Sequence, residues 1–257
     1  MEATQHDHDA ARPRPGAVAA AWAVHLYTMS GVAFALLTVV AVIEGDTVRA
    51  LWLGLVAMVI DGTDCMLARQ VRVKEVVPWF DGALLDNIVD YLTYAFTPMV
   101  LLWSAGYLGE GTWAQVLAIV PLVASAFQFC RTDAKTEDHY FLGFPSYWNV
   151  VAFYAFVLDL PPAVVTVVVV VCAVLVFVPV KYLYPSRTPR YRGLNLGLAG
   201  LWLVLYAVIL VQLPDPNPFA LGLSLAYLAY YLVASVLLTS LHRFRQVHAR
   251  PADVTSR

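Results

Sequence analysis

Runs of apolar residues long enough to cross a lipid bilayer recur along the chain, and they limit its fold more than any other feature. A helix needs about 20 residues to span the hydrocarbon core, and only helices and closed barrels satisfy their backbone groups inside lipid. With 60% hydrophobic and 13% charged residues over 257 positions, the chain lies outside the range of soluble globular domains. We therefore predict an all-α, polytopic membrane helix bundle with about eight transmembrane helices. The predicted spans are residues 18–43, 48–68, 83–106, 113–130, 146–160 (a short one), 162–182, 194–213 and 219–241.

The polar ends flank one predicted domain. Residues 1–16 are polar and contain proline, so we expect a disordered cytoplasmic N-terminus. The apolar run after them is too long for a signal-peptide core, and we expect it to be retained as the first span. Residues 17–243 form the predicted transmembrane domain, and residues 244–257 form a basic cytoplasmic tail.

The basic residues predict the orientation, because cytoplasmic loops carry an excess of Lys and Arg. When the N-terminus is placed inside, only Arg49 of the 16 Lys and Arg residues falls in an outer loop. Both termini are therefore expected in the cytoplasm. The formal net charge of −2 gives no indication of a nucleic-acid partner.

Four aspartates lie at helical spacing beside the expected cytoplasmic surface. Asp61 and Asp64 are three residues apart and Asp86 and Asp90 are four apart, so each pair projects from one helix face. The basic link between the pairs is short, which favours two antiparallel helices with adjacent acidic ends. At about 1.5 Å per residue, the second pair lies about 9–15 Å along its helix, inside the hydrocarbon edge.

Carboxylates at this depth need a cationic partner. One Asp costs about 2.5–3.5 kcal/mol on insertion scales, and four cost on the order of 10 kcal/mol together. Oxygen ligands in this number suit one or two hard divalent cations, Mg²⁺ or Mn²⁺. The alternative is a buried charge network without metal or substrate. Cys65, Cys130 and Cys172 have no CxxC spacing, so neither a disulfide framework nor a thiolate metal site is predicted.

Polar and small residues near the acids are candidates for contact with a phosphate or a nucleotide. Thr28 and Ser30 can donate hydrogen bonds from the first span, although such residues also mediate ordinary helix packing in membranes. Gly62 and Ala68 allow a ligand or the third helix to approach closely. Arg69 lies on the same helix face as Asp61, about two turns further along the chain. There it can neutralise carboxylates or bind phosphate.

The acidic stretch carries a recognisable signature. DGTDCMLAR at 61–69, followed by GALLDNIVD at 82–90, resembles the motif of the CDP-alcohol phosphotransferases. The twelve residues between the two halves exceed the usual spacing, and this spacer, with GFPSYWNVVAFY and PVKYLYPSRTPRYR, is similar to the bacterial phosphatidylcholine synthase branch. Where the family has glycine after the second aspartate, this chain has Cys65, which would reshape the cavity for the cytidine nucleotide.

The resemblance implies an enzyme of the bacterial inner membrane, with its active site on the cytoplasmic side. Such enzymes transfer the phosphatidyl group of CDP-diacylglycerol to choline and release CMP. By the resemblance, Asp61, Asp64 and Asp86 bind one ion, Mn²⁺ or Mg²⁺, and Asp61, Asp86 and Asp90 bind a second. Asp90 is then the general base for the choline hydroxyl. The candidates for binding CDP-diacylglycerol, with the diphosphate at the arginine, are Thr28, Ser30, Gly62, Cys65, Ala68, Arg69 and Gly82.

Choline keeps a positive charge at every pH, so its recognition needs aromatic faces or carboxylates. Aromatic residues near the cytoplasmic side are candidates, although single interfacial aromatics usually form the headgroup-level belt. The candidates are Trp79, Tyr91, Tyr94, Tyr147, Trp148, Tyr182 and Tyr184.

Two other functions stay open. The same chemistry could use serine, inositol phosphate or glycerol phosphate as the acceptor. Intramembrane acids also mark the pathways of divalent-cation or proton-coupled transporters, but here they gather at one end of two helices.

The seventh span carries three glycines that suit helix contact within a homodimer. They are Gly193, Gly197 and Gly200.

Overall fold

The computed structural model describes residues 13–134, 140–183 and 192–248. Two helices form its first hairpin, α1 (Pro15–Ile43) and α2 (Thr47–Gln70). In the turn between them, the side chain of Asp46 accepts a hydrogen bond from the Arg49 backbone at 2.9 Å and caps α2. Because α1 begins at Pro15, the helix reaches into the segment predicted to be disordered. The described residues do not include most of that segment, the tail beyond residue 248, or Tyr184.

The third predicted span forms a helix whose geometry changes partway. Its parts follow one another without a gap: α4 (Gly82–Asp90), the π-helix η1 (Tyr91–Phe96) and α5 (Thr97–Ser104). Pro98 has no backbone N–H to donate to the carbonyl four residues back. The N–H of Thr97 instead bonds to the Leu92 carbonyl, five residues back. The π turn thus lies between the last aspartate of the acidic stretch and this proline.

Beyond α5, the described part of the chain adds five helices and a short β-ribbon. Leu142, the last residue of β1, pairs with Lys181, the first of β2, and the two strands run antiparallel. An all-α prediction contains no such ribbon, which joins the segment after the fourth predicted span to the last residues of the sixth, 162–182. These elements are α6 (Gly111–Cys130), β1 (Tyr140–Leu142), α7 (Trp148–Val157), α8 (Pro162–Phe177), β2 (Lys181–Leu183), α9 (Arg192–Val211) and α10 (Pro218–His248).

Within the described residues, five helices are long and apolar enough to cross a membrane: α1, α2, α6, α9 and residues 218–240 of α10. This confirms an all-α membrane bundle. The fifth and sixth predicted spans form α7, with 10 residues, and α8, with 16. At 1.5 Å per residue these helices measure about 15 and 24 Å, shorter than a bilayer core of about 30 Å.

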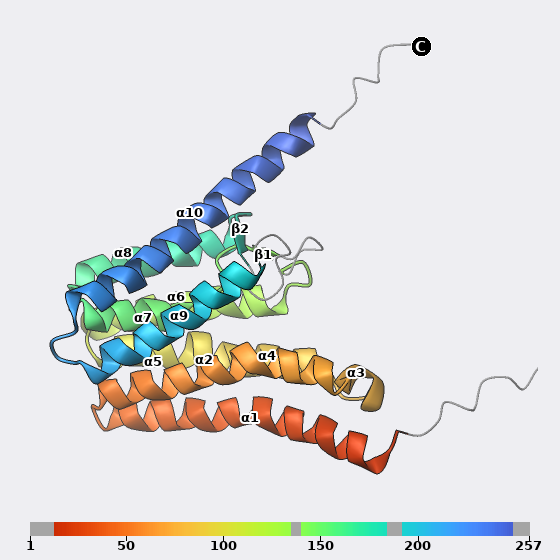
Figure 1. Cartoon of the computed structure of the whole chain (residues 1–257). Helices are drawn as coiled ribbons and strands as arrows, with labels where there is room; N and C mark the ends of the chain where they lie inside the picture. The colour runs from red at the N-terminus through yellow and green to blue at the C-terminus, as the bar shows by residue number, and fades with distance from the viewer. Residues whose placement is uncertain (1–12, 135–139, 184–191, 249–257) are drawn as a thin grey trace, which may run out of the picture.

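Figure 1 shows α1 and α2 at one side of the bundle and α8 and α10 at the opposite side. Between them, the main core contains Phe153 and Tyr206, whose rings stack with centroids 3.7 Å apart. Apolar side chains on the outer faces stay exposed, including Val167 and Val174 of α8. Exposed apolar side chains on a bundle of this composition are suited to contact with lipid tails.

A second, smaller core holds the long spacer between the two acidic helices. The spacer contains the single-turn helix α3 (Val73–Val76), and Val73 and Val77 pack against Ala21 and Val24 of α1. This packing fixes the start of α4. A Cβ atom on Gly82, the first residue of α4, would lie only 3.0 Å from the His25 ring. The spacer therefore docks α4 onto α1 at the end of the bundle where the aspartates lie.

Candidate metal centre and active site

The four aspartates come from two helices that meet beside α1. Asp61 and Asp64 lie in the second half of α2, and Asp86 and Asp90 lie in α4. The close approach of α1 to α4 depends on Gly31, because a Cβ atom there would collide with the side chain of Val89. Gly31 therefore serves the packing of α1 against α4.

The structure gathers the acids into two groups that share one member. Asp61, Asp86 and Asp90 offer ligand atoms within 4.8 Å of one another, and so do Asp64, Cys65 and Asp86. Opposite oxygen ligands of one Mg²⁺ ion lie about 4.2 Å apart, twice its usual metal–oxygen distance. Each group therefore has about the size that one ion requires.

The chemistry of the donors fits a divalent cation. The first group offers only carboxylate oxygens, which are the ligands that hard cations prefer. The second group includes a sulfur atom from Cys65, whereas the resemblance implies Asp61 in that set. The departure from the family signature thus lies directly beside an ion position.

Two hydroxyl groups from neighbouring helices hold the carboxylates. Thr28 of α1 donates to the Oδ2 atom of Asp64 at 2.7 Å, and Asp64 is only 4% exposed. Tyr94 of η1 donates to the Oδ2 atom of Asp61 at 2.5 Å. Donors of this kind orient metal-binding carboxylates in proteins. Thr28, which the sequence suggests as a substrate contact, is therefore engaged with a carboxylate.

The other candidates for CDP-diacylglycerol occupy different surroundings. Ser30 donates to the Tyr27 carbonyl of its own helix at 2.6 Å, and Gly82 packs on His25. Gly62 borders open space, since a Cβ atom there would meet nothing within 4 Å. Arg69 is exposed and donates to the Cys65 carbonyl at 2.9 Å. Ala68 lies against the smaller core. Of this set, Gly62 and Arg69 offer the most accessible surface.

Three of the predicted aromatic residues meet beside the acids, together with one that sequence reasoning missed. The ring of Tyr94 lies 6.0 Å from that of Tyr147, and Tyr147 lies 6.2 Å from Tyr231 of α10. The ring of Tyr182 stacks on Tyr231 at 6.4 Å. We call Tyr94, Tyr147, Tyr182 and Tyr231 the tyrosine cluster. Tyr182 and Tyr231 are buried, whereas Tyr94 and Tyr147 are only partly buried and offer the ring faces that a ligand can reach. The sequence offers no signal that separates Tyr231 from its neighbours in the last span.

The remaining predicted aromatics lie elsewhere. Trp148 is fully buried and donates to Ser125 at 2.7 Å, so its ring serves the core and is not accessible to choline. Tyr91 turns towards α6, where its hydroxyl lies 3.4 Å from the Leu122 carbonyl. Trp79 is 74% exposed and lies 5.6 Å from Trp22 of α1, in a separate aromatic group.

A cationic residue at the end of α6 has a partner of its own. Arg131, directly after α6, donates two hydrogen bonds of 2.7 Å to Asp133. These bonds raise the pKa of the Arg131 guanidinium and lower the pKa of the Asp133 carboxyl. Arg131 is therefore engaged at the surface just beyond the bundle.

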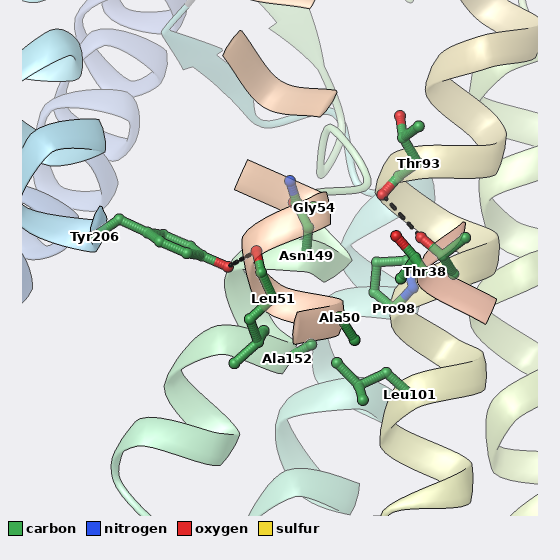
Figure 2. A pocket seen from close by; sticks show the side chains of 11 residues that line it. Thr38, Ala50, Leu51, Gly54, Thr93, Pro98, Leu101, Asn149, Ala152 and Tyr206 are labelled. Atoms are coloured by element: carbon green, nitrogen blue, oxygen red, sulfur yellow. Dashed lines mark hydrogen bonds between the residues drawn. The ribbon is translucent and has the colours of Figure 1, made fainter. Parts of the chain in front are cut away.

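A small polar pocket lies deeper in the bundle, between α1, α2, α5 and α7 (Figure 2). It is lined in part by Thr38, Thr93, Thr97 and Asn149, and its volume is about 20 Å³. That volume suits roughly one water molecule, which is far too small for a nucleotide or a lipid. The acidic groups are therefore the better candidate for the active site.

Comparison with known proteins identifies the family. The chain is 43% identical to the phosphatidylcholine synthase of Pseudomonas aeruginosa over 216 residues, covering 83% of this chain and 90% of the relative. It is 41% identical to that of Legionella pneumophila over 233 residues (88% and 91%) and 33% identical to that of Borreliella burgdorferi over 221 residues (85% and 94%). No protein-family model matches the chain. These relatives confirm the resemblance of the acidic stretch, and the chain belongs to the bacterial phosphatidylcholine synthase branch of the CDP-alcohol phosphotransferases.

Proposed function

We propose that this enzyme transfers the phosphatidyl group of CDP-diacylglycerol to choline and releases CMP. The observation that carries the proposal is the meeting of four carboxylates from α2 and α4, inside a chain whose relatives are phosphatidylcholine synthases. Phosphoryl transfer depends mainly on positioning and on stabilisation of charge. A polar centre embedded in an apolar bundle is suited to both.

The acidic groups would hold one or two divalent cations, Mn²⁺ or Mg²⁺, through Asp61, Asp64, Asp86 and Asp90. When bound, these ions stabilise the negative charge on the transferring phosphoryl group. Asp86 belongs to both groups and would be shared between them. Thr28 and Tyr94 hold the carboxylates of Asp64 and Asp61 in place.

Asp90 acts as the general base in this proposal. Its carboxylate takes the proton from the choline hydroxyl, and the choline oxygen attacks the phosphorus that bears diacylglycerol. A new phosphorus–oxygen bond to choline forms as the bond to the CMP oxygen breaks. Arg69, at the exposed end of α2, is placed to bind the diphosphate through its guanidinium group.

The tyrosine cluster supports choline as the acceptor. A quaternary ammonium binds to the faces of aromatic rings, and the cluster begins at Tyr94, whose hydroxyl contacts Asp61. Serine, inositol phosphate and glycerol phosphate carry anionic groups, which bind to basic side chains and not to the faces of aromatic rings. The tyrosines beside the acids therefore favour a cationic alcohol.

The same proposal places the enzyme in the bacterial inner membrane with its acidic end towards the cytoplasm. This orientation is supported by the basic residues that precede α1 and follow α2 and α6. Residues 82–104 form a helix about 34 Å long, which is sufficient for a further crossing besides the five. The proposed eight crossings within one domain, residues 17–243, with both termini in the cytoplasm, also include α7 and α8. Because these two helices are shorter than the bilayer core, their crossings would require local thinning of the bilayer.

The experiment is an assay of purified protein with CDP-diacylglycerol and labelled choline, with and without Mn²⁺ or Mg²⁺. We expect metal-dependent release of CMP and formation of phosphatidylcholine. Asp90→Asn, which keeps the shape of the side chain, should lower the rate by about 10²–10⁴-fold, the usual contribution of a general base. Asp215→Asn, an exposed change in the turn between α9 and α10, is the matched control.

Three outcomes would contradict the proposal. They are release of CMP without a divalent ion, a faster reaction with serine or glycerol phosphate than with choline, and ion transport without formation of CMP.

A further inference from the structure

Tyr94 makes two different contacts at the candidate site. Its hydroxyl donates to the Oδ2 atom of Asp61 at 2.5 Å, while its ring lies 6.0 Å from the ring of Tyr147. One side chain thus touches both a metal-binding carboxylate and the aromatic surface beside it. Resting on the function proposed above, we propose that Tyr94 is a positioning residue that fixes Asp61 for metal binding and couples the metal centre to the choline site.

The backbone explains why this residue reaches Asp61. Tyr94 lies in the π-helix η1, directly after the aspartates of α4. A π turn closes each hydrogen bond over five residues instead of four, so it changes the direction of the side chains that follow Asp90. Such turns occur frequently at functional sites. Pro98, which has no backbone N–H to donate, follows this turn in the first turn of α5.

The hydroxyl and the ring have separable roles. A donor bound to one carboxylate oxygen limits rotation of the group and leaves the other oxygen available to the ion. Asp61 belongs to the oxygen-only group with Asp86 and Asp90, so its orientation affects that ion position directly. The ring instead forms one wall of the tyrosine cluster, where a quaternary ammonium would bind.

The surroundings of Tyr94 suit this double role. Its ring is partly buried, and the residues on either side of it in η1, Thr93 and Ala95, are buried in the bundle. Thr93 donates to the Val89 carbonyl at 3.0 Å, which anchors the same turn to α4. The tyrosine therefore extends from a backbone held on both sides.

Two substitutions separate the hydroxyl from the ring. Tyr94→Phe keeps the ring, and we expect it to weaken Mn²⁺ binding by about 10–100-fold, as is typical when a partner of a metal ligand is lost. Mn²⁺ binding is measured without substrate, by the electron paramagnetic resonance signal of the free ion. At saturating Mn²⁺ the KM for choline should change less than about twofold. Tyr94→Leu should weaken Mn²⁺ binding and also raise the KM for choline by about 5–30-fold.

Tyr230→Phe is the matched control. It removes a tyrosine hydroxyl that donates to Asn195 at 2.9 Å, on α10 and away from the acids. We expect its Mn²⁺ affinity to equal that of the unchanged enzyme. Thermal unfolding of all three variants shows whether a loss of affinity merely follows a loss of stability.

The proposal is overturned if Tyr94→Phe binds Mn²⁺ as tightly as the unchanged enzyme. It is also overturned if Tyr230→Phe loses as much affinity, or if the loss follows the unfolding temperature in all variants. The proposed function can be rejected independently of the role of Tyr94. An unchanged enzyme whose Mn²⁺ affinity depends on the Tyr94 hydroxyl but which forms no phosphatidylcholine would support the positioning role and reject choline transfer.

Discussion

The bundle contains two polar regions whose hydroxyl groups behave differently. At the acidic centre, Thr28 and Tyr94 donate across helix boundaries to carboxylates, at 2.7 and 2.5 Å. In the deeper pocket of Figure 2, Thr38 donates within its own helix to the Phe34 carbonyl at 2.8 Å, and Thr97 lies 3.4 Å from the Thr93 carbonyl. These threonine hydroxyls of the pocket are thus satisfied within their own helix, whereas the hydroxyls at the centre support charges on another helix.

This difference shows how to interpret polar residues inside membrane helices. A Ser or Thr hydroxyl can always bond to a carbonyl one turn back, so its presence alone predicts little. A hydroxyl that instead binds a carboxylate on a neighbouring helix helps to offset the cost of a buried charge. Only the second kind indicates a functional centre, and substitutions in the two regions should differ accordingly.

The largest effect is expected from Asp86→Asn. Asp86 belongs to both carboxylate groups, so its loss affects both ion positions at once. Since bound ions contribute several kcal/mol to such reactions, we expect the turnover to fall by roughly 10³-fold, measured as CMP release at saturating Mn²⁺. Asp64→Asn removes a ligand from one group only, so it should lower the turnover less than Asp86→Asn does. An equal loss in both variants would argue against a shared ligand.

Thr28→Val tests the contrast between the two regions directly. Valine has a similar shape but cannot donate to Asp64, so we expect Mn²⁺ affinity to fall by about 10–100-fold. Thr38→Val makes the same change in the same helix, at the deeper pocket. Its Mn²⁺ affinity and turnover should stay within about twofold of the unchanged enzyme, because its hydroxyl bonds only to its own helix. Similar losses of Mn²⁺ affinity in both variants would contradict the difference between the acidic centre and the deeper pocket.

Tyr147→Leu addresses the aromatic side of the centre. Loss of one ring from a cation–π contact costs about 1–2 kcal/mol, so the KM for choline should rise about 5–30-fold. The KM for CDP-diacylglycerol should stay nearly unchanged. Trp79→Leu removes a ring from the separate aromatic group and should leave both values within about twofold. A larger rise in the KM for choline in Trp79→Leu than in Tyr147→Leu would indicate that choline binds beside the spacer.

Cys65→Ser should have the smallest effect on the reaction itself. Serine keeps the size of the side chain, so turnover with Mg²⁺ should change less than about twofold. Sulfur favours soft cations, and Cys65 offers a sulfur atom next to Asp64 and Asp86. Inhibition by Cd²⁺ should therefore need several-fold more metal in the variant. Equal sensitivity to Cd²⁺ would place the sulfur outside the ion position.

The local features of this protein follow from its sequence. The apolar runs predict the membrane helices because length and hydropathy are properties of contiguous residues. The spacings of Asp61, Asp64, Asp86 and Asp90 predict which acids share a helix face, since helical periodicity is also local. The signature around them indicates the family, which the relatives confirm.

Tertiary structure decided which partners those residues meet. Tyr94 and Tyr231 belong to one cluster although 136 residues separate them in the chain, and no local pattern marks that meeting. The engagement of Thr28 with Asp64, the docking of the spacer on α1, and the β-ribbon depend on how helices pack, which distant side chains determine together. Periodicity gives the face on which a residue lies, whereas helix packing fixes which atom it touches.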